Sequence, residues 1–152
     1  RPSPKGGLRT FPAIRFLMAA VNFDWELVSG SRVLAVMGRN ERRMSGASLA
    51  WDEVAIVLGE NAVVLSVNYD TDEVVVDLSA VPASDDWQEV SSLQRLVAKP
   101  LGWCWVVTNY RGYSDGFILA LGDVLPEALE PKLMFLGEGS ALTCFQMTPV
   151  GY

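Results

Sequence analysis

Histidine is absent from this chain of 152 residues. Its absence excludes the Ser-His-Asp and Cys-His arrangements, which use imidazole as the general base near neutral pH. It also removes the commonest metal ligand. No glycine-rich loop stands before a predicted helix, as a nucleotide-binding loop would require. The sequence therefore favours a protein that is not an enzyme, and we expect neither a cofactor nor a metal site.

Cysteine is scarce, with Cys104 and Cys144 each inside an apolar run. We interpret both as buried free thiols, because small buried cysteines are common in protein cores. A disulfide is the alternative, and it would require their two strands to be neighbours. Free thiols favour a reducing, cytoplasmic location. No apolar run approaches the ~20 residues that a membrane-spanning helix needs, so we expect no membrane span.

Basic residues are too few to balance the acidic ones, and the net charge is −6. Nucleic-acid affinity comes largely from Lys and Arg, so we do not expect nucleic-acid binding. An acidic surface instead suits another protein as partner, and a basic one would fit it best. One basic cluster, Arg39, Arg42 and Arg43, lies in the loop of residues 38–46 and could hold a carboxylate or phosphate. A solvated loop is the alternative interpretation.

Short runs of alternating apolar and polar residues, separated by turn residues, indicate about eight strands joined mostly as hairpins. The predicted strands are Ser31–Met37, Asp52–Leu58, Ala62–Asn68, Glu73–Leu78, Trp103–Thr108, Phe117–Leu121, Lys132–Leu136 and Ala141–Met147.

Two segments favour helices. The apolar spacing of Val90, Leu93, Leu96 and Val97 predicts a helix over Trp87–Ala98, and residues 8–23 fit a second, shorter one. The predicted fold class is therefore α+β, with a curved, mostly antiparallel sheet and one or two helices packed on it. We predict a flexible tail at residues 1–7 and a single domain over residues 8–152.

The stretch of residues 99–121 organises the rest, because it holds two strongly apolar runs joined by a turn-rich connection. Neither run has a polar stripe, which is typical of central strands covered on both faces. Alternation places Trp103, Trp105 and Val107 on one face of the first run. We expect both tryptophans to lie mostly in the interior.

This hairpin resembles the signature of a family of small bacterial proteins of unknown function. The matching residues are Gly102, Trp103, Trp105, Asn109, Gly112, Tyr113, Asp115 and Gly116. The family often has Gln where this chain has Tyr110 and Arg111, and it has an acidic end to the second strand where this chain has Ala120 and Leu121. The resemblance implies no activity.

Two functions are compatible with these residues. The first is a non-catalytic protein-interaction module, such as an immunity-type protein, an accessory protein or a peripheral subunit of a larger assembly. In it Tyr110, Arg111, Tyr113 and Asp115 form part of the partner surface, because Tyr and Arg are enriched where interfaces gain most energy. The alternative is a small-ligand-binding protein or hydrolase that uses the Asp115 carboxylate. A third role for Asp115, and for Asn109, is to fix the turn.

Overall fold

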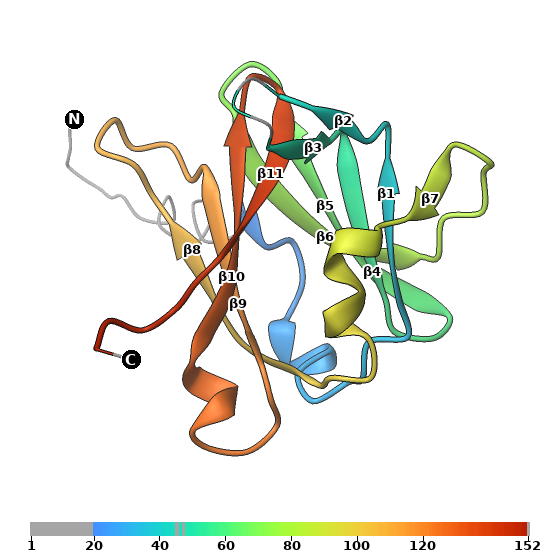
Figure 1. The fold of residues 1–152 in the computed structure, drawn as a ribbon, viewed down its shortest axis with the longest axis vertical. Helices are drawn as coiled ribbons and strands as arrows, with labels where there is room; N and C mark the ends of the chain where they lie inside the picture. Colours follow the sequence, from blue (N-terminus) through green and yellow to red (C-terminus); the bar gives the residue numbers. More distant parts are fainter. Residues whose placement is uncertain (1–19, 45, 47, 152) are drawn as a thin grey trace, which may run out of the picture.

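The computed structural model describes residues 20–151 apart from residues 45 and 47, and its regular secondary structure is almost entirely β-strand (Figure 1). The strands are β1 (Ala35–Arg39), β2 (Arg42–Arg43), β3 (Leu49–Trp51), β4 (Glu53–Val57), β5 (Asn61–Asn68), β6 (Glu73–Ala80), β7 (Trp87–Glu89), β8 (Leu101–Val107), β9 (Gly116–Leu121), β10 (Pro131–Glu138) and β11 (Ala141–Gln146). Three short 3-10 helices complete the described part: η2 (Trp25–Leu27), η3 (Ser91–Leu96) and η4 (Glu127–Leu129).

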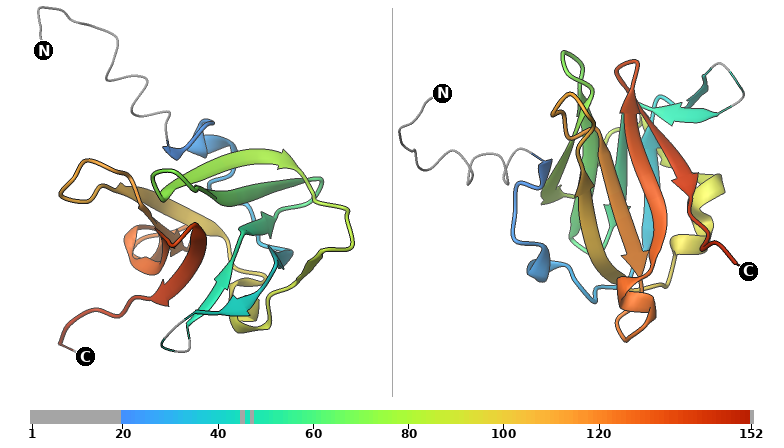
Figure 2. Two further views of the ribbon diagram at one scale, coloured as in Figure 1. Left: turned by 90° about the horizontal axis from the view of Figure 1, so that it is seen from above. Right: turned by 90° about the vertical axis from the view of Figure 1, so that its left-hand side faces the viewer.

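The strands form two sheets that face each other, as Figure 2 shows from two further directions. One sheet has five strands in the order β6-β5-β4-β1-β7, and the other has six in the order β2-β3-β11-β10-β9-β8. Every pairing between these strands is antiparallel. Hairpin turns join β5 to β6, β8 to β9 and β10 to β11. The predicted hairpins therefore form, but they are divided between two sheets.

The core lies between the sheets and draws on both. Its members from the five-stranded sheet include Val54, Ile56 and Leu65, and those from the six-stranded sheet include Phe117 and Phe135. These side chains are removed from solvent almost completely. Burial of this kind is the main favourable contribution to folding.

The chain crosses from one sheet to the other at a corner. Asp52 alone separates β3 in the six-stranded sheet from β4 in the five-stranded sheet, and two residues separate β1 from β2 at the same place. Gly38 makes room at this corner, because a Cβ there would lie 2.6 Å from Cδ1 of the buried Trp51 ring. Bends of this type let neighbouring strands contribute to two packed sheets.

The predicted helix over Trp87–Ala98 is wrong. Trp87–Glu89 forms β7 and pairs with β1, and the remainder is the 3-10 segment η3, which is kinked at Leu93. The physical reason lies in the spacing: the buried residues Val90, Leu93 and Leu96 recur every third position, which is the period of a 3-10 helix. The second predicted helix falls largely on residues 8–19, which lie outside the described residues.

The predicted fold class must be corrected accordingly. The protein is a nearly all-β fold of two antiparallel sheets, not an α+β fold with helices packed on one curved sheet. The number of strands can be estimated from the sequence, but this number does not show how the strands are distributed between two sheets. At Asp52 the chain passes from one sheet to the other, so the strands do not form the single curved sheet that was predicted.

The central hairpin forms as predicted, with β8 antiparallel to β9. The expectation that both runs are central strands covered on both faces is not met. β8 is an edge strand, and β9 is an interior strand whose outward-facing Ile118 is only half-buried. The expectation for the tryptophans is wrong for Trp103, which is 55% exposed. Trp105 is half-buried and lies outside the core cluster. Both point to the outer face of the sheet, while Cys104 packs against the core.

Candidate functional site

Three hairpin turns meet at one end of the molecule, at the top of the right-hand view of Figure 2. They are the β5–β6 turn (residues 69–72), the β8–β9 loop (residues 108–115) and the β10–β11 turn (residues 139–140). Three of the four tyrosines in the chain, Tyr69, Tyr110 and Tyr113, lie in these turns. We call this region the tyrosine end.

Hydrogen bonds between the turns tie the tyrosine end together. The Asp72 carboxylate accepts hydrogen bonds from the backbone N–H groups of Gly139 (3.2 Å) and Ser140 (2.9 Å). The Glu73 carboxylate accepts one from the N–H of Ser114 (3.0 Å). The N–H of Gly137 donates to the Asp115 carbonyl oxygen (2.8 Å). Because these bonds join both sheets, the end behaves as one preorganised surface.

The contact at Gly137 is especially close. A Cβ at this position would lie 2.1 Å from the carbonyl oxygen of Asp72 and 3.5 Å from Cγ1 of Val67. Only a residue without a side chain permits the β5–β6 turn to rest on β10 here.

The β8–β9 loop is held from inside by Asn109. Its side-chain oxygen accepts hydrogen bonds from the N–H groups of Arg111 (2.8 Å) and Tyr113 (3.2 Å). Its amide nitrogen donates to the Asp115 carboxylate (3.0 Å). The backbone of Gly112 has φ of +91°, a conformation that favours glycine. Asn109 therefore has the turn role predicted for it.

The aromatic rings of the tyrosine end face solvent. Tyr110 is 96% exposed, Tyr69 is 78% exposed and Tyr113 is 41% exposed. Arg111 is also exposed, and its side chain has no hydrogen-bond or ion-pair partner among the described residues. An ordered loop that displays large amphipathic rings resembles the paratopes of binding proteins, where Tyr supplies contact area at low entropic cost.

Asp115 is half-buried and hydrogen-bonded within its own loop. Its carboxylate contacts the Asn109 amide, and its carbonyl oxygen holds the Gly137 N–H. This environment favours the turn role over an acid or base role. The structure brings Tyr110, Arg111, Tyr113 and Asp115 together in one loop, as their closeness in sequence requires.

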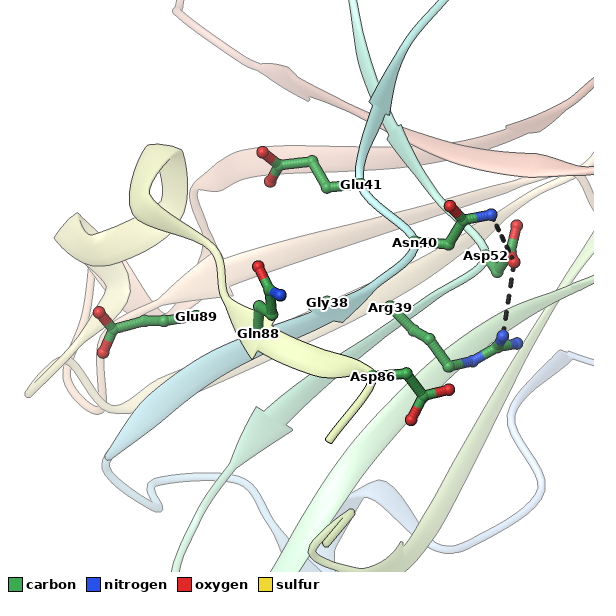
Figure 3. A pocket seen from close by; sticks show the side chains of 8 residues that line it. All are labelled: Gly38, Arg39, Asn40, Glu41, Asp52, Asp86, Gln88 and Glu89. Atoms are coloured by element: carbon green, nitrogen blue, oxygen red, sulfur yellow. Dashed lines mark hydrogen bonds and ion pairs between the residues drawn. The ribbon is translucent and has the colours of Figure 1, made fainter. Parts of the chain in front are cut away.

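A second feature is the polar recess of about 560 Å³ at the corner between the sheets. Figure 3 shows its lining, which comes from the end of β1, the following turn, Asp52 and the β7 region. The lining residues are Gly38, Arg39, Asn40, Glu41, Asp52, Asp86, Gln88 and Glu89. Four of them are acidic and one is basic, so the recess is an acidic environment.

Arg39 and Arg42 brace this corner. The Asp52 carboxylate contacts Nη1 of Arg42 (3.0 Å) and Nη1 of Arg39 (3.5 Å), and it accepts a hydrogen bond from the Asn40 amide (3.1 Å). Nε of Arg39 donates to Glu53 (2.9 Å). Because both guanidinium groups are already bound to carboxylates, the contacts favour a structural role over anion binding. Arg43 is exposed and lies beside Arg42 in β2.

Hydrogen bonds shift the pKa values of two residues of the recess, Arg39 and Asp86. The hydrogen bond to Glu53 is the largest of the effects that raise the pKa of Arg39 above its ordinary value. The hydroxyl of Ser84 donates a hydrogen bond to Asp86 and, with a smaller effect from the charge of Arg39, lowers the pKa of that carboxyl. Among the described residues, no group of three or more His, Cys, Asp or Glu side chains is arranged to hold a metal ion.

The two thiols are free, as predicted. Burial raises the pKa of Cys104 to about 11 and that of Cys144 to about 12. At such values the thiolate is a minor species near neutral pH, so neither thiol is suited to nucleophilic chemistry.

Neither Tyr69 nor the acidic recess was among the predicted site residues. Tyr69 stands in a turn between two predicted strands, as Tyr110 and Tyr113 do. That shared position was a usable signal. The recess had no such signal, because Asp52 and Asp86 are far apart in sequence and meet only where β7 pairs with β1.

The fold and the site define a class of protein: a two-sheet antiparallel β domain with a rigid, tyrosine-bearing loop end. The chain belongs to the family of unknown function DUF6334, which matches residues 18–151. No curated protein and no solved structure gives a significant match to the chain. None of the helices among the described residues is long and apolar enough to cross a membrane.

Proposed function

We propose that this protein is a non-catalytic interaction module that binds another protein through the tyrosine end. The observation that carries the proposal is the exposure of Tyr69, Tyr110 and Tyr113 on loops that hydrogen bonds hold in place. Because little loop entropy is lost on binding, a preordered surface gains more affinity from each contact. An accessory protein, an immunity-type protein or a peripheral subunit would each use such a surface.

The charge of this end supports a basic partner. Five carboxylates belong to its turns and the adjoining strand ends, against the single cation Arg111; they are Asp70, Asp72, Glu73, Asp115 and Glu138. Two of them, Asp72 and Glu73, accept hydrogen bonds from backbone N–H groups. Complementary charge raises the association rate and makes binding weaken with salt. The two free thiols support a cytoplasmic, reducing setting.

The experiment compares what binds the wild type and a Tyr69→Ala, Tyr110→Ala, Tyr113→Ala variant expressed with an affinity tag in the source organism. Quantitative mass spectrometry would identify the partner, and purified partner would then be titrated by calorimetry. We expect the triple variant to lose at least tenfold in affinity with an unchanged melting temperature. A Leu27→Ala, Leu34→Ala variant, which truncates two exposed apolar residues elsewhere, is the matched control. An equal affinity of the wild type and the triple variant would refute the proposal.

The hydrolase alternative rests on Asp115 and can be tested separately from the interaction module. Asp115→Asn keeps the size of the side chain and an oxygen that can accept the hydrogen bond from Asn109, and it removes the negative charge. A purified wild-type protein that hydrolyses ester or amide substrates, with activity lost in Asp115→Asn, would favour the alternative over the interaction module.

A further inference from the structure

The four edges of the two sheets differ in how they are protected. The edge of β6 is partly covered, because Val21 bridges Val76 and the N–H of Asn22 donates to the Val76 carbonyl oxygen (2.9 Å). β7 has three residues and β2 has two, so their edges are short. The two long edges among the described strands are β6, with eight residues, and β8, with seven. The edge of β6 is bonded at a second point, because the N–H of Val74 donates to the Ser114 carbonyl oxygen (3.0 Å), and it carries the charged residues Glu73 and Asp77.

Only the beginning of β8 is covered by described residues. The N–H and carbonyl groups of Leu101 bond to Ser31 (2.9 Å) and Gly30 (2.7 Å), and the Gly102 carbonyl oxygen accepts the Trp25 indole N–H (2.8 Å). From Trp103 to Val107 the one strand paired with β8 in the described part is β9. This five-residue edge therefore presents backbone groups that a further strand could pair with.

The same five residues lack the usual safeguards of an edge. Natural edge strands carry Lys, Pro or inward-pointing charges that prevent further pairing. Residues 103–107 of β8 read WCWVV and contain none of these. Trp103 is 55% exposed and Val106 is 43% exposed, so both faces of the edge offer apolar surface. An exposed apolar edge of this kind is expected to be covered in the working state of the protein.

The outer face of the six-stranded sheet continues this apolar surface. The strand register sets Trp105 beside Ile118, Ile118 beside Met134, and Met134 beside Phe145. All four are half-buried or exposed, and no charged residue interrupts the row. A bulge leaves Gly102 and Trp103 opposite the single residue Ala120, which turns Trp103 to this same face.

We propose that β8 pairs antiparallel with β8 of a second copy of this chain, so that the two six-stranded sheets join into one. The strand that pairs with this edge must be extended and uncharged, with apolar side chains on both faces. β8 itself meets that description. Two chains of net charge −6 repel each other over most of their surfaces, so an uncharged strand is where they can approach. The pairing is isologous and closed, because both copies use the same apolar edge.

The test is sedimentation velocity of the full chain over a wide range of protein concentration. We expect a reversible monomer–dimer equilibrium in the wild type. Trp103→Lys should weaken the dimer at least tenfold, because it places a desolvated charge at the joint. Leu27→Lys, which makes the same exchange at a 67% exposed site on η2, should leave the dimer unchanged. A monomer at every concentration, or a dimer that Trp103→Lys does not weaken, would overturn the inference.

Hydrogen exchange separates strand pairing from packing of the outer faces. Pairing predicts that amides within residues 103–107 become protected as the dimer forms and lose that protection in Trp103→Lys. A dimer whose β8 amides exchange as fast as those of the monomer would refute the strand pairing. The inference does not depend on the tyrosine end, and the triple tyrosine variant should dimerise as the wild type does.

Discussion

The two faces of the six-stranded sheet are both apolar, yet only one is a core. On β10, Phe135 faces inward and is fully buried, while its neighbour Met134 faces outward and is half-buried. On β9, Leu119 faces inward and Ile118 outward in the same way. Apolar character alone therefore does not identify a core face, because the five-stranded sheet covers only one side. The uncovered side is available for binding.

The difference in stability contribution between the two faces is tested most directly by truncating adjacent residues that point to opposite faces. Phe135→Ala should reduce the free energy of unfolding by about 3–5 kcal/mol, because it leaves a cavity between the sheets. Met134→Ala should cost no more than about 1 kcal/mol, since the side chain is only half-buried. Urea unfolding followed by tryptophan fluorescence would measure both. Equal losses would mean that the outer face contributes as much as the core.

A smaller effect is expected where the inner face meets the tyrosine end. Gly137→Ala would push the Asp72 carbonyl oxygen away and should cost about 1–3 kcal/mol, as for other overpacked sites. Gly139→Asn is the control, because its φ of +58° suits Asn and its site is roomier. It should change stability by less than about 0.5 kcal/mol. Thermal unfolding would show whether close backbone packing or glycine loss as such is responsible.

Local sequence signals were sufficient for most of the strands. The predicted strands Ala62–Asn68 and Ala141–Met147 correspond to β5 and β11 within one residue at each end. Turn residues between alternating runs locate hairpins well, because both signals are local. Asn109 was correctly given a turn role for the same reason.

Long-range organisation was not predictable in the same way. The division into two sheets depends on the corner at Asp52, where ion pairs with Arg39 and Arg42 form only after folding. The exposure of Trp103 depends on β8 lying at an edge, and the WCWVV pattern is equally typical of a covered strand. The recess needs β7 beside β1, which the helical interpretation of Trp87–Ala98 excluded.

The loop of the tyrosine end should be less sensitive to truncation than the inner face of the six-stranded sheet. Asn109→Ala removes three side-chain hydrogen bonds, but the freed N–H groups of Arg111 and Tyr113 are exposed enough to bind water. We expect a loss of about 1 kcal/mol. Hydrogen exchange should increase within residues 109–115 and stay unchanged in β10. Thr108→Ala, which removes a single contact with Ser114, is the control. A global loss as large as that of Phe135→Ala would show that the loop is part of the core.

The smallest expected difference is in the reactivity of the two cysteines on the inner face. Cys104 lies on an edge strand and Cys144 on an interior strand. Burial raises the pKa of Cys104 in β8 to about 11 and that of Cys144 in β11 to about 12, from a starting value of 9.0. Below pH 9.0 the thiols are protonated in both the folded and unfolded chains, so their contribution to stability is fully present. It is lost as pH rises through the folded values of about 11 and 12, because the unfolded chain ionises first.

Iodoacetamide labelling with mass spectrometry should modify Cys104 before Cys144, and both slowly compared with the urea-unfolded chain. Dimerisation through β8 should slow Cys104 further and leave Cys144 unchanged. Equal labelling rates at the two sites would mean that the edge strand is no more accessible than the interior one.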